Sequence, residues 1–255
     1  MNEFFRRVAM MNRDMPKSTK NIYTALFILL VVFVGYQVKN NPYILLMVIV
    51  FYFAIVLHEV AHGAMANIYG DPTAKIAGRL TLNPIKHIDI VGTIIPIVLI
   101  LIGTPFLIGW AKPVPVNFRM LKNKKVGMFM VAIAGVAVNF LLAILAGIFL
   151  VFMTKIQMSP FAADILSKLM TYMIEINIIL GIFNLIPIPP LDGSRVIYAF
   201  ADYKVRNFLD SMENYGIFII IALMIFGVLD KFLNPMADLV KSGLGIIMES
   251  LYKIL

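Results

Sequence analysis

Six long apolar runs are the feature that most constrains the fold of this chain. They cover residues 21–38, 43–67, 91–109, 127–153, 167–186 and 214–232. Each approaches or exceeds the ~20 residues that a helix needs to cross roughly 30 Å of hydrocarbon. Hydrophobic residues make up 61% of the 255-residue chain and charged residues 14%, whereas a soluble chain is roughly 45–50% apolar and about 25% charged. We therefore predict an all-α polytopic membrane protein with five to six transmembrane helices.

The polar stretches between these runs are too short to form a separate domain. We expect one transmembrane domain over residues 1–255, with a cytoplasmic lead at 1–20 and a membrane core at 21–232. Residues 233–255 are predicted to form an amphipathic interfacial helix or a last membrane helix. Because the chain has no cysteine, disulfides and thiolate metal ligands are excluded.

The net charge of +8 would suggest nucleic acid as a partner of a soluble protein. In a membrane protein, Lys and Arg instead mark the cytoplasmic loops. With the N-terminus in the cytoplasm, sixteen Lys and Arg residues lie inside and three or four outside. We therefore expect a multi-pass protein of the cell membrane that has the lipid bilayer around it and no nucleic-acid partner. The oligomeric state is left open.

The second run ends in His58-Glu59-Val60-Ala61-His62. Random placement of three His and five Glu gives this H-E-x-x-H pattern only about 0.0007 times in such a chain. Residues i and i+4 share one helix face, so both imidazoles can bind one Zn²⁺, with Glu59 beside them as a general base. The alternative is a polar group satisfied inside a helix bundle. Ionisable groups cost roughly 2.5–3.5 kcal/mol each in a membrane, which favours a compensating ion.

A catalytic zinc ion takes three protein ligands and keeps an open position. His87 is the only other histidine, but it lies in a polar surface loop, where we expect a structural role. Asp192 is the better candidate. Three prolines at 187–190 end the preceding helix, and Gly193 permits a sharp turn. Such a loop holds a carboxylate at membrane depth only where it lines a cavity. The alternative is a simple helix-end turn with a solvated Asp192.

Together these motifs resemble the site-2 proteases, which are intramembrane zinc metalloproteases. The pattern N-x-x-P-x-x-x-x-D-G at 184–193 accompanies the H-E-x-x-H pattern, and the likeness extends to residues 80–89, 109–116 and 134–139. It is greatest to the compact prokaryotic branch without PDZ or CBS domains. Two departures, Val136 and Ile90, stand at positions where the family often has proline, and neither removes a catalytic group.

The resemblance implies roles for five residues of this chain. His58, His62 and Asp192 would bind zinc, Glu59 would be the base, and Asn184 would contact substrate. Substrate contact and ordinary helix packing are both open for Asn139 and Asn177, which also lie inside apolar runs. We take Asn139 with Asn184 as the substrate-binding candidates.

The shared metal site also constrains the topology. His58 and His62 lie in the cytoplasmic half of the second run, and Asp192 must reach the same depth. Residues 91–109 must then begin and end in the cytoplasm, as a re-entrant hairpin, in agreement with their Gly and Pro content. Residues 75–82 alternate in polarity, which predicts a short strand or β-hairpin at the membrane surface.

The sequence thus predicts an intramembrane zinc endopeptidase. It would cleave transmembrane segments of substrate proteins with a metal-activated water. One alternative is a membrane zinc protease that acts on non-transmembrane peptides. Another is a non-catalytic metal-binding membrane protein, against which the intact Glu59 argues, because a pure binding site needs no base.

Overall fold

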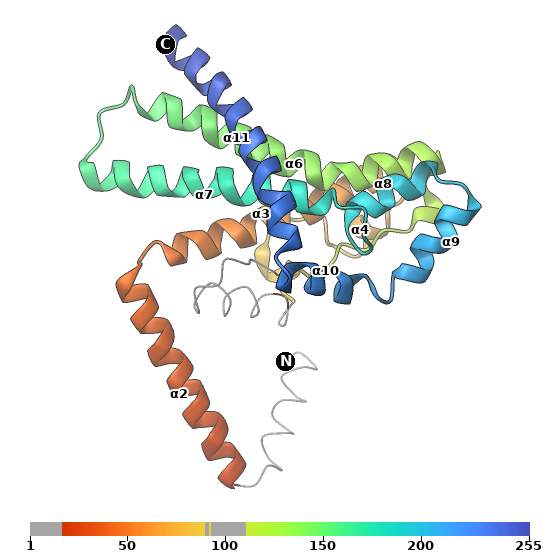
Figure 1. Cartoon of the computed structure of the whole chain (residues 1–255), viewed down its shortest axis with the longest axis horizontal. Coiled ribbons are helices and arrows are strands. Elements are labelled where there is room, and N and C mark those ends of the chain that lie inside the picture. Colours follow the sequence, from red (N-terminus) through yellow and green to blue (C-terminus); the bar gives the residue numbers. More distant parts are fainter. Residues whose placement is uncertain (1–16, 90–91, 93–110) are drawn as a thin grey trace. The chain divides into compact units, whose positions relative to one another are not determined.

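The computed structural model of this chain describes residues 17–89, 92 and 111–255, and within them the fold is helical. Figure 1 labels the α-helices, and two short 3₁₀ helices, η1 and η2, lie between them in chain order. They are α2 (Lys17–Asn40), α3 (Ile44–Ile68), α4 (Thr73–Ile76), η1 (Pro84–His87), η2 (Phe118–Met120), α6 (Lys124–Met153), α7 (Pro160–Asn184), α8 (Asp192–Phe200), α9 (Tyr203–Met212), α10 (Gly216–Ile225) and α11 (Val228–Ile254). The all-α part of the prediction is confirmed.

Among the described residues, three helices are long and apolar enough to cross a membrane, namely α3, α6 and α7. A fourth span results if α9 and α10, which bend by 70° at their junction, form one broken span. Five to six spans are therefore not confirmed. Residues 93–110 lie outside the described residues, so the re-entrant hairpin at 91–109 stays a prediction.

The predicted strand or β-hairpin at residues 75–82 is wrong, because this segment begins as helix α4 and continues through a turn. Asp71 accepts a hydrogen bond from the backbone N–H of Thr73 at 3.0 Å and thereby stabilises the start of the helical turn. Gly78, with φ +62°, reverses the chain. The Arg79 guanidinium then donates to the Lys112 carbonyl at 2.5 Å. The alternating polarity reflects these separate contacts and not a strand.

The apolar run at 214–232 is not one continuous helix. Gly227 adopts φ +65° between α10 and α11, a conformation that glycine allows without strain. The helix that follows begins at Val228, so the predicted C-terminal segment 233–255 starts within α11. α11 is not among the described helices apolar enough to cross a membrane, and the choice between an interfacial and a membrane helix stays a prediction.

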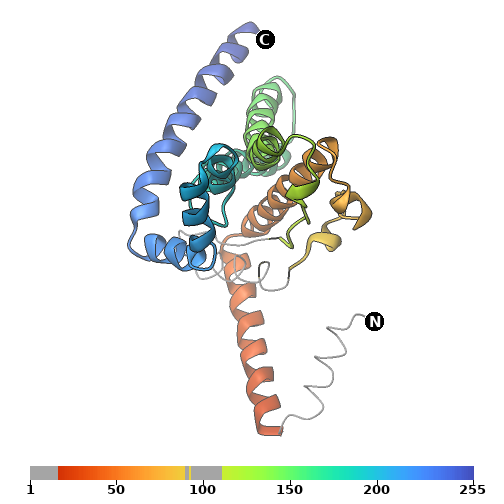
Figure 2. The same ribbon diagram turned by 90° about the vertical axis from the view of Figure 1, so that its right-hand side faces the viewer.

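The core of residues 46–255 is built on the antiparallel pair α6 and α7, whose lengths run side by side (Figures 1 and 2). α3 packs on this pair through a cluster that includes Phe51, Ala54 and Ile176. α11 packs across it through Ala237 and Leu244. Helix α2 belongs to a unit that ends at Leu45 and is described by itself. The metal-ligand candidates lie where α3 meets α6 and the end of α7.

Candidate metal centre

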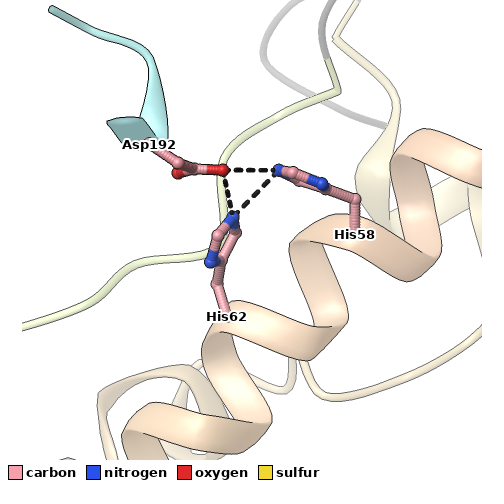
Figure 3. Close-up of side chains that lie close together, drawn as sticks. All are labelled: His58, His62 and Asp192. Atoms are coloured by element: carbon pink, nitrogen blue, oxygen red, sulfur yellow. Dashed lines mark hydrogen bonds and ion pairs between the residues drawn. The ribbon is translucent and has the colours of Figure 1, made fainter. Parts of the chain in front are cut away.

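Three predicted ligands lie together at one point of the structure (Figure 3). His58 and His62 are one helical turn apart on α3, and their Nε2 atoms are 2.9 Å apart. Oδ2 of Asp192 is 3.1 Å from Nε2 of His58 and 3.2 Å from Nε2 of His62. Both histidines are buried. The structure therefore brings an α3 face and the start of α8 to a common site.

The loop between α7 and α8 positions Asp192 through close backbone contacts. A Cβ atom on Gly193 would stand 2.1 Å from the carbonyl oxygen of Leu185, and one on Gly216 would stand 1.6 Å from that of Pro189. The hydroxyl of Ser194 donates to the carbonyl of Leu191 at 2.6 Å. Only glycine permits such approaches of backbone to backbone. The N-terminus of α8 is thus held against the end of α7, with Asp192 as its first residue.

The second nitrogen of each imidazole faces an acceptor on α6. Nδ1 of His62 is 2.7 Å from the carbonyl oxygen of Val131, and Nδ1 of His58 is 2.6 Å from Oδ1 of Asn139. An imidazole that donates from Nδ1 presents a lone pair at Nε2. Both Nε2 lone pairs then point toward the carboxylate of Asp192.

These residues fit a zinc ion. Oδ2 of Asp192 is buried and has no hydrogen-bond partner, and with both imidazoles donating from Nδ1, three acceptor atoms converge on one point. Such an arrangement calls for a cation. Two imidazole nitrogens and one carboxylate oxygen are a typical catalytic zinc donor set. Ligands at about 2.0–2.1 Å in tetrahedral geometry stand roughly 3.3 Å apart, close to the observed separations of 2.9–3.2 Å.

Gly135 of α6 makes room for both histidines. A Cβ atom at this position would lie 2.5 Å from Nε2 of His62 and 2.6 Å from Cε1 of His58. Real Cβ atoms essentially never come so close to other heavy atoms. α6 therefore passes directly against the ligand atoms only because residue 135 has no side chain. The sequence places Gly135 and Asn139 four residues apart on one helix face, but it contains no signal that Gly135 contacts the histidines.

Glu59, the candidate base, is held by a segment distant in sequence. Its Oε2 accepts a hydrogen bond from the backbone N–H of Val114 at 2.8 Å. Val114 stands between Pro113 and Pro115, which have no N–H to offer. The lone N–H between the two prolines is the sequence signal for this contact.

Asp71 holds the segment around Val114 against the end of α3. Its Oδ2 accepts from the backbone N–H of Asn117 at 2.6 Å, and its Oδ1 from the hydroxyl and backbone N–H of Thr73. Burial raises the pKa of this carboxyl, but the hydrogen bonds from Thr73 and Asn117 outweigh that effect, and the net pKa lies below its ordinary value. Asp71 is therefore a charged anchor between two segments that flank the site.

The other residues singled out in the sequence, Asn139, Asn184 and His87, make hydrogen bonds within the protein. Asn139 is buried, and both ends of its amide have partners within the protein: Oδ1 faces His58, and Nδ2 donates to Asn177 at 2.8 Å. Asn184, at the end of α7, is half-buried and donates to the Leu180 carbonyl at 2.9 Å. Neither contact tests a role toward substrate. His87 is buried away from the cluster, with Nε2 2.8 Å from the Thr81 carbonyl, in agreement with a structural role.

Comparisons with known proteins place this site in context. Residues 151–227, which include Asp192, match the family described as Peptidase family M50. A Bacillus subtilis protein, "Putative zinc metalloprotease YwhC", is 39% identical over 195 residues, which are 76% of this chain and 84% of that protein. No solved structure matches.

Two further relatives are more distant. The "Putative zinc metalloprotease Rip2" of Mycolicibacterium smegmatis is 26% identical over 70% of this chain and 66% of its own length. The "Zinc metalloprotease MJ0392" of Methanocaldococcus jannaschii is 26% identical over 82% of this chain and 50% of its own length.

Proposed function

Because this chain belongs to peptidase family M50, the site-2 protease family, we propose that it is an intramembrane zinc endopeptidase that cleaves transmembrane segments of other proteins. The family and the His–His–Asp cluster support a membrane zinc metalloprotease. The observation that carries the finer proposal is the position of the site. His58 and His62 lie on α3, a helix long and apolar enough to cross a membrane.

The residues of this chain divide the chemistry between them. His58, His62 and Asp192 would hold the metal. A Zn²⁺ ion held there would supply Lewis acidity toward a water molecule and toward the scissile carbonyl. Glu59 follows His58 on the same helix, so its carboxylate is placed to take a proton from the attacking water and deliver it to the leaving amine. The Val114 N–H holds that carboxylate from a second direction.

A helical substrate must unwind before its carbonyl can react, because a helix keeps its carbonyls in hydrogen bonds. Residues 75–82 contain α4 and a turn, so they form no strand with which an unwound substrate could pair. Asn184 is the substrate contact that we retain. It lies at the C-terminal end of α7, eight residues before Asp192, and is half-buried.

The charges of the loops support one orientation in the membrane. We place the N-terminus and the loops rich in Lys and Arg in the cytoplasm, following the positive-inside rule. The zinc ligands then lie toward the cytoplasmic end of α3. Water would reach them from that side.

The decisive experiment compares the wild-type protein with Glu59→Gln, which keeps the side-chain size but removes the base. Both proteins should carry about one zinc ion per chain, which metal analysis measures. In membranes that contain the wild-type protein, mass spectrometry should find fragments cut inside transmembrane segments, and these fragments should be absent with Glu59→Gln. Cuts confined to soluble tails would instead favour a membrane protease for non-transmembrane peptides. Cleavage by Glu59→Gln above a tenth of the wild-type rate would exclude Glu59 as the base.

A further inference from the structure

A line of buried hydrogen bonds leads away from His58 across three helices. Nδ1 of His58 on α3 faces Oδ1 of Asn139 on α6 at 2.6 Å, and Nδ2 of Asn139 donates to Oδ1 of Asn177 on α7 at 2.8 Å. Nδ2 of Asn177 in turn donates to the Met173 carbonyl at 2.8 Å. Both amides are fully buried. Burial of an amide in apolar surroundings is unfavourable unless it is hydrogen-bonded, and here each amide has a partner at both ends.

The last member of this line fixes its direction. A backbone carbonyl can only accept, so Asn177 must turn its NH₂ group toward Met173 and its oxygen toward Asn139. Asn139 must then turn its own NH₂ group toward Asn177, and its oxygen toward His58. The proton of the His58 imidazole is therefore drawn to Nδ1, and the lone pair is left on Nε2, the atom that faces Asp192.

His62 is held in the same tautomer by a direct contact, since its Nδ1 is 2.7 Å from the Val131 carbonyl oxygen. A backbone carbonyl therefore orients both imidazoles: that of Val131 contacts His62 directly, and that of Met173 acts on His58 through the amides of Asn177 and Asn139. Metal-binding histidines commonly depend on such an acceptor at the second nitrogen, which sets the tautomer and the ring orientation.

We propose that Asn177 is a positioning residue of the metal centre, which acts through Asn139 to fix the tautomer and the ring orientation of His58. The inference rests on the proposed metal centre but not on the identity of the substrate. Loss of an outer partner of a ligand typically lowers metal affinity 10–100-fold. Because Asn177 acts one hydrogen bond further out, we expect a loss of about tenfold.

Two variants of Asn177 distinguish the effect of its hydrogen bonds on the metal centre from the effect of its side-chain packing. Asn177→Leu has a similar size but neither accepts nor donates. Asn177→Asp keeps an oxygen that accepts from Asn139, and at this buried position its carboxyl is neutral, so that its O–H donates to the Met173 carbonyl. This variant therefore preserves the direction of the line. Ile178→Ala is the matched control, because Ile178 is the fully buried neighbour on α7 and packs in the cluster with Ala143 and Leu244. It leaves a cavity without touching the amides.

The test measures metal binding and not proteolysis, so it distinguishes a failure of this inference from a failure of the proposed function. Zinc affinity is measured by competition with a chelator. The environment of each imidazole is read from ¹⁵N spectra of histidine-labelled protein, which has only three histidines, and from the visible spectrum after Co²⁺ substitution. His62 is an internal control, since its acceptor is a backbone carbonyl.

Asn177→Leu should weaken zinc binding about tenfold and move the His58 nitrogen signals, while those of His62 stay in place. Asn177→Asp should keep near wild-type affinity. Ile178→Ala should lower the unfolding temperature with zinc affinity unchanged. The proposal is overturned if Asn177→Leu binds zinc as tightly as the wild type. It is also overturned if either Asn177→Asp or Ile178→Ala loses as much zinc affinity as Asn177→Leu.

Discussion

Gly135 lies directly against His62, so that a Cβ atom on residue 135 would stand 2.5 Å from Nε2, the nitrogen that faces Asp192. The close passage of α6 behind the ligands thus depends on the absence of one methyl group. Gly135→Ala should move the imidazoles and lower zinc affinity at least tenfold, as measured by chelator competition. Gly245→Ala is the control, because a Cβ atom there meets nothing within 4 Å. Unchanged zinc affinity in Gly135→Ala would contradict the close approach.

Asp192 is expected to be the third zinc ligand. Asp192→Ala removes the only carboxylate of the cluster, so purified protein should contain less than a tenth of the wild-type zinc after dialysis against a chelator. Asp238→Ala, which removes an exposed carboxylate on α11, should leave the zinc content at about one per chain. Full zinc occupancy in Asp192→Ala would remove this residue from the ligand set.

Val114 is expected to orient Glu59 through its backbone N–H. Val114→Pro deletes this donor, whereas Val114→Ala retains it. Since general base catalysis contributes about 10²–10⁴-fold to rate, loss of the orienting contact should reduce kcat tenfold or more while zinc stays bound. Turnover and zinc content are measured on the same samples. Equal turnover of the two variants would show that the contact with Glu59 at 2.8 Å does not matter for catalysis.

Asp71 predicts how stability depends on pH. Its pKa is lower in the folded protein than in the unfolded chain, so its stabilising contribution is complete above the unfolded pKa of about 3.9 and is lost as the pH falls through the folded pKa. Asp71→Asn should cost roughly 1–3 kcal/mol at neutral pH, and this difference should shrink below about pH 4. Thermal unfolding in detergent at several pH values measures both proteins. A difference that grows on acidification would contradict the assigned sign.

The proposed orientation is tested by single cysteines in this cysteine-free chain. Pro115→Cys and Asn123→Cys should react with an impermeant maleimide only after the membrane is permeabilised. Gln157→Cys, between α6 and α7, should react from outside in intact cells. Labelling of position 115 or 123 from outside would contradict the re-entrant hairpin at 91–109 and reopen the topology.

The sequence predicted the ligands because their signals are local. His58 and His62 share a helix face through a spacing of four residues, and the three prolines before Asp192 end α7 where a carboxylate is needed. The contacts behind the ligands come from other helices. That Asn139 faces His58 depends on how α6 packs against α3, and no spacing within either helix encodes it.

The differences between the prediction and the structure also have local physical causes. Alternating polarity at 75–82 predicted a strand, but Asp71 accepts a hydrogen bond from the backbone N–H of Thr73, the first residue of the short helix α4. The run at 214–232 has enough apolar residues for a span, but Gly227 takes a left-handed conformation within it. The hydrogen bond to Asp71 and the left-handed conformation of Gly227 each decide the local structure against the hydrophobic pattern. The backbone conformation at a single residue can decide whether a helix or strand continues.

The separation of the ligands along the chain has a further consequence. His62 and Asp192 are 130 residues apart (192 − 62), so a shared ion closes a large loop, for which chain entropy opposes closure. Contacts between helices already bring the two ends together: Ile176 packs with α3, and Gly216 packs on Pro189. The donor atoms are therefore preorganised, and the affinity for metal does not have to include the ordering of the chain. Helix packing in this protein would thus act as a chelating scaffold, which holds the three donor atoms close together before a metal ion binds.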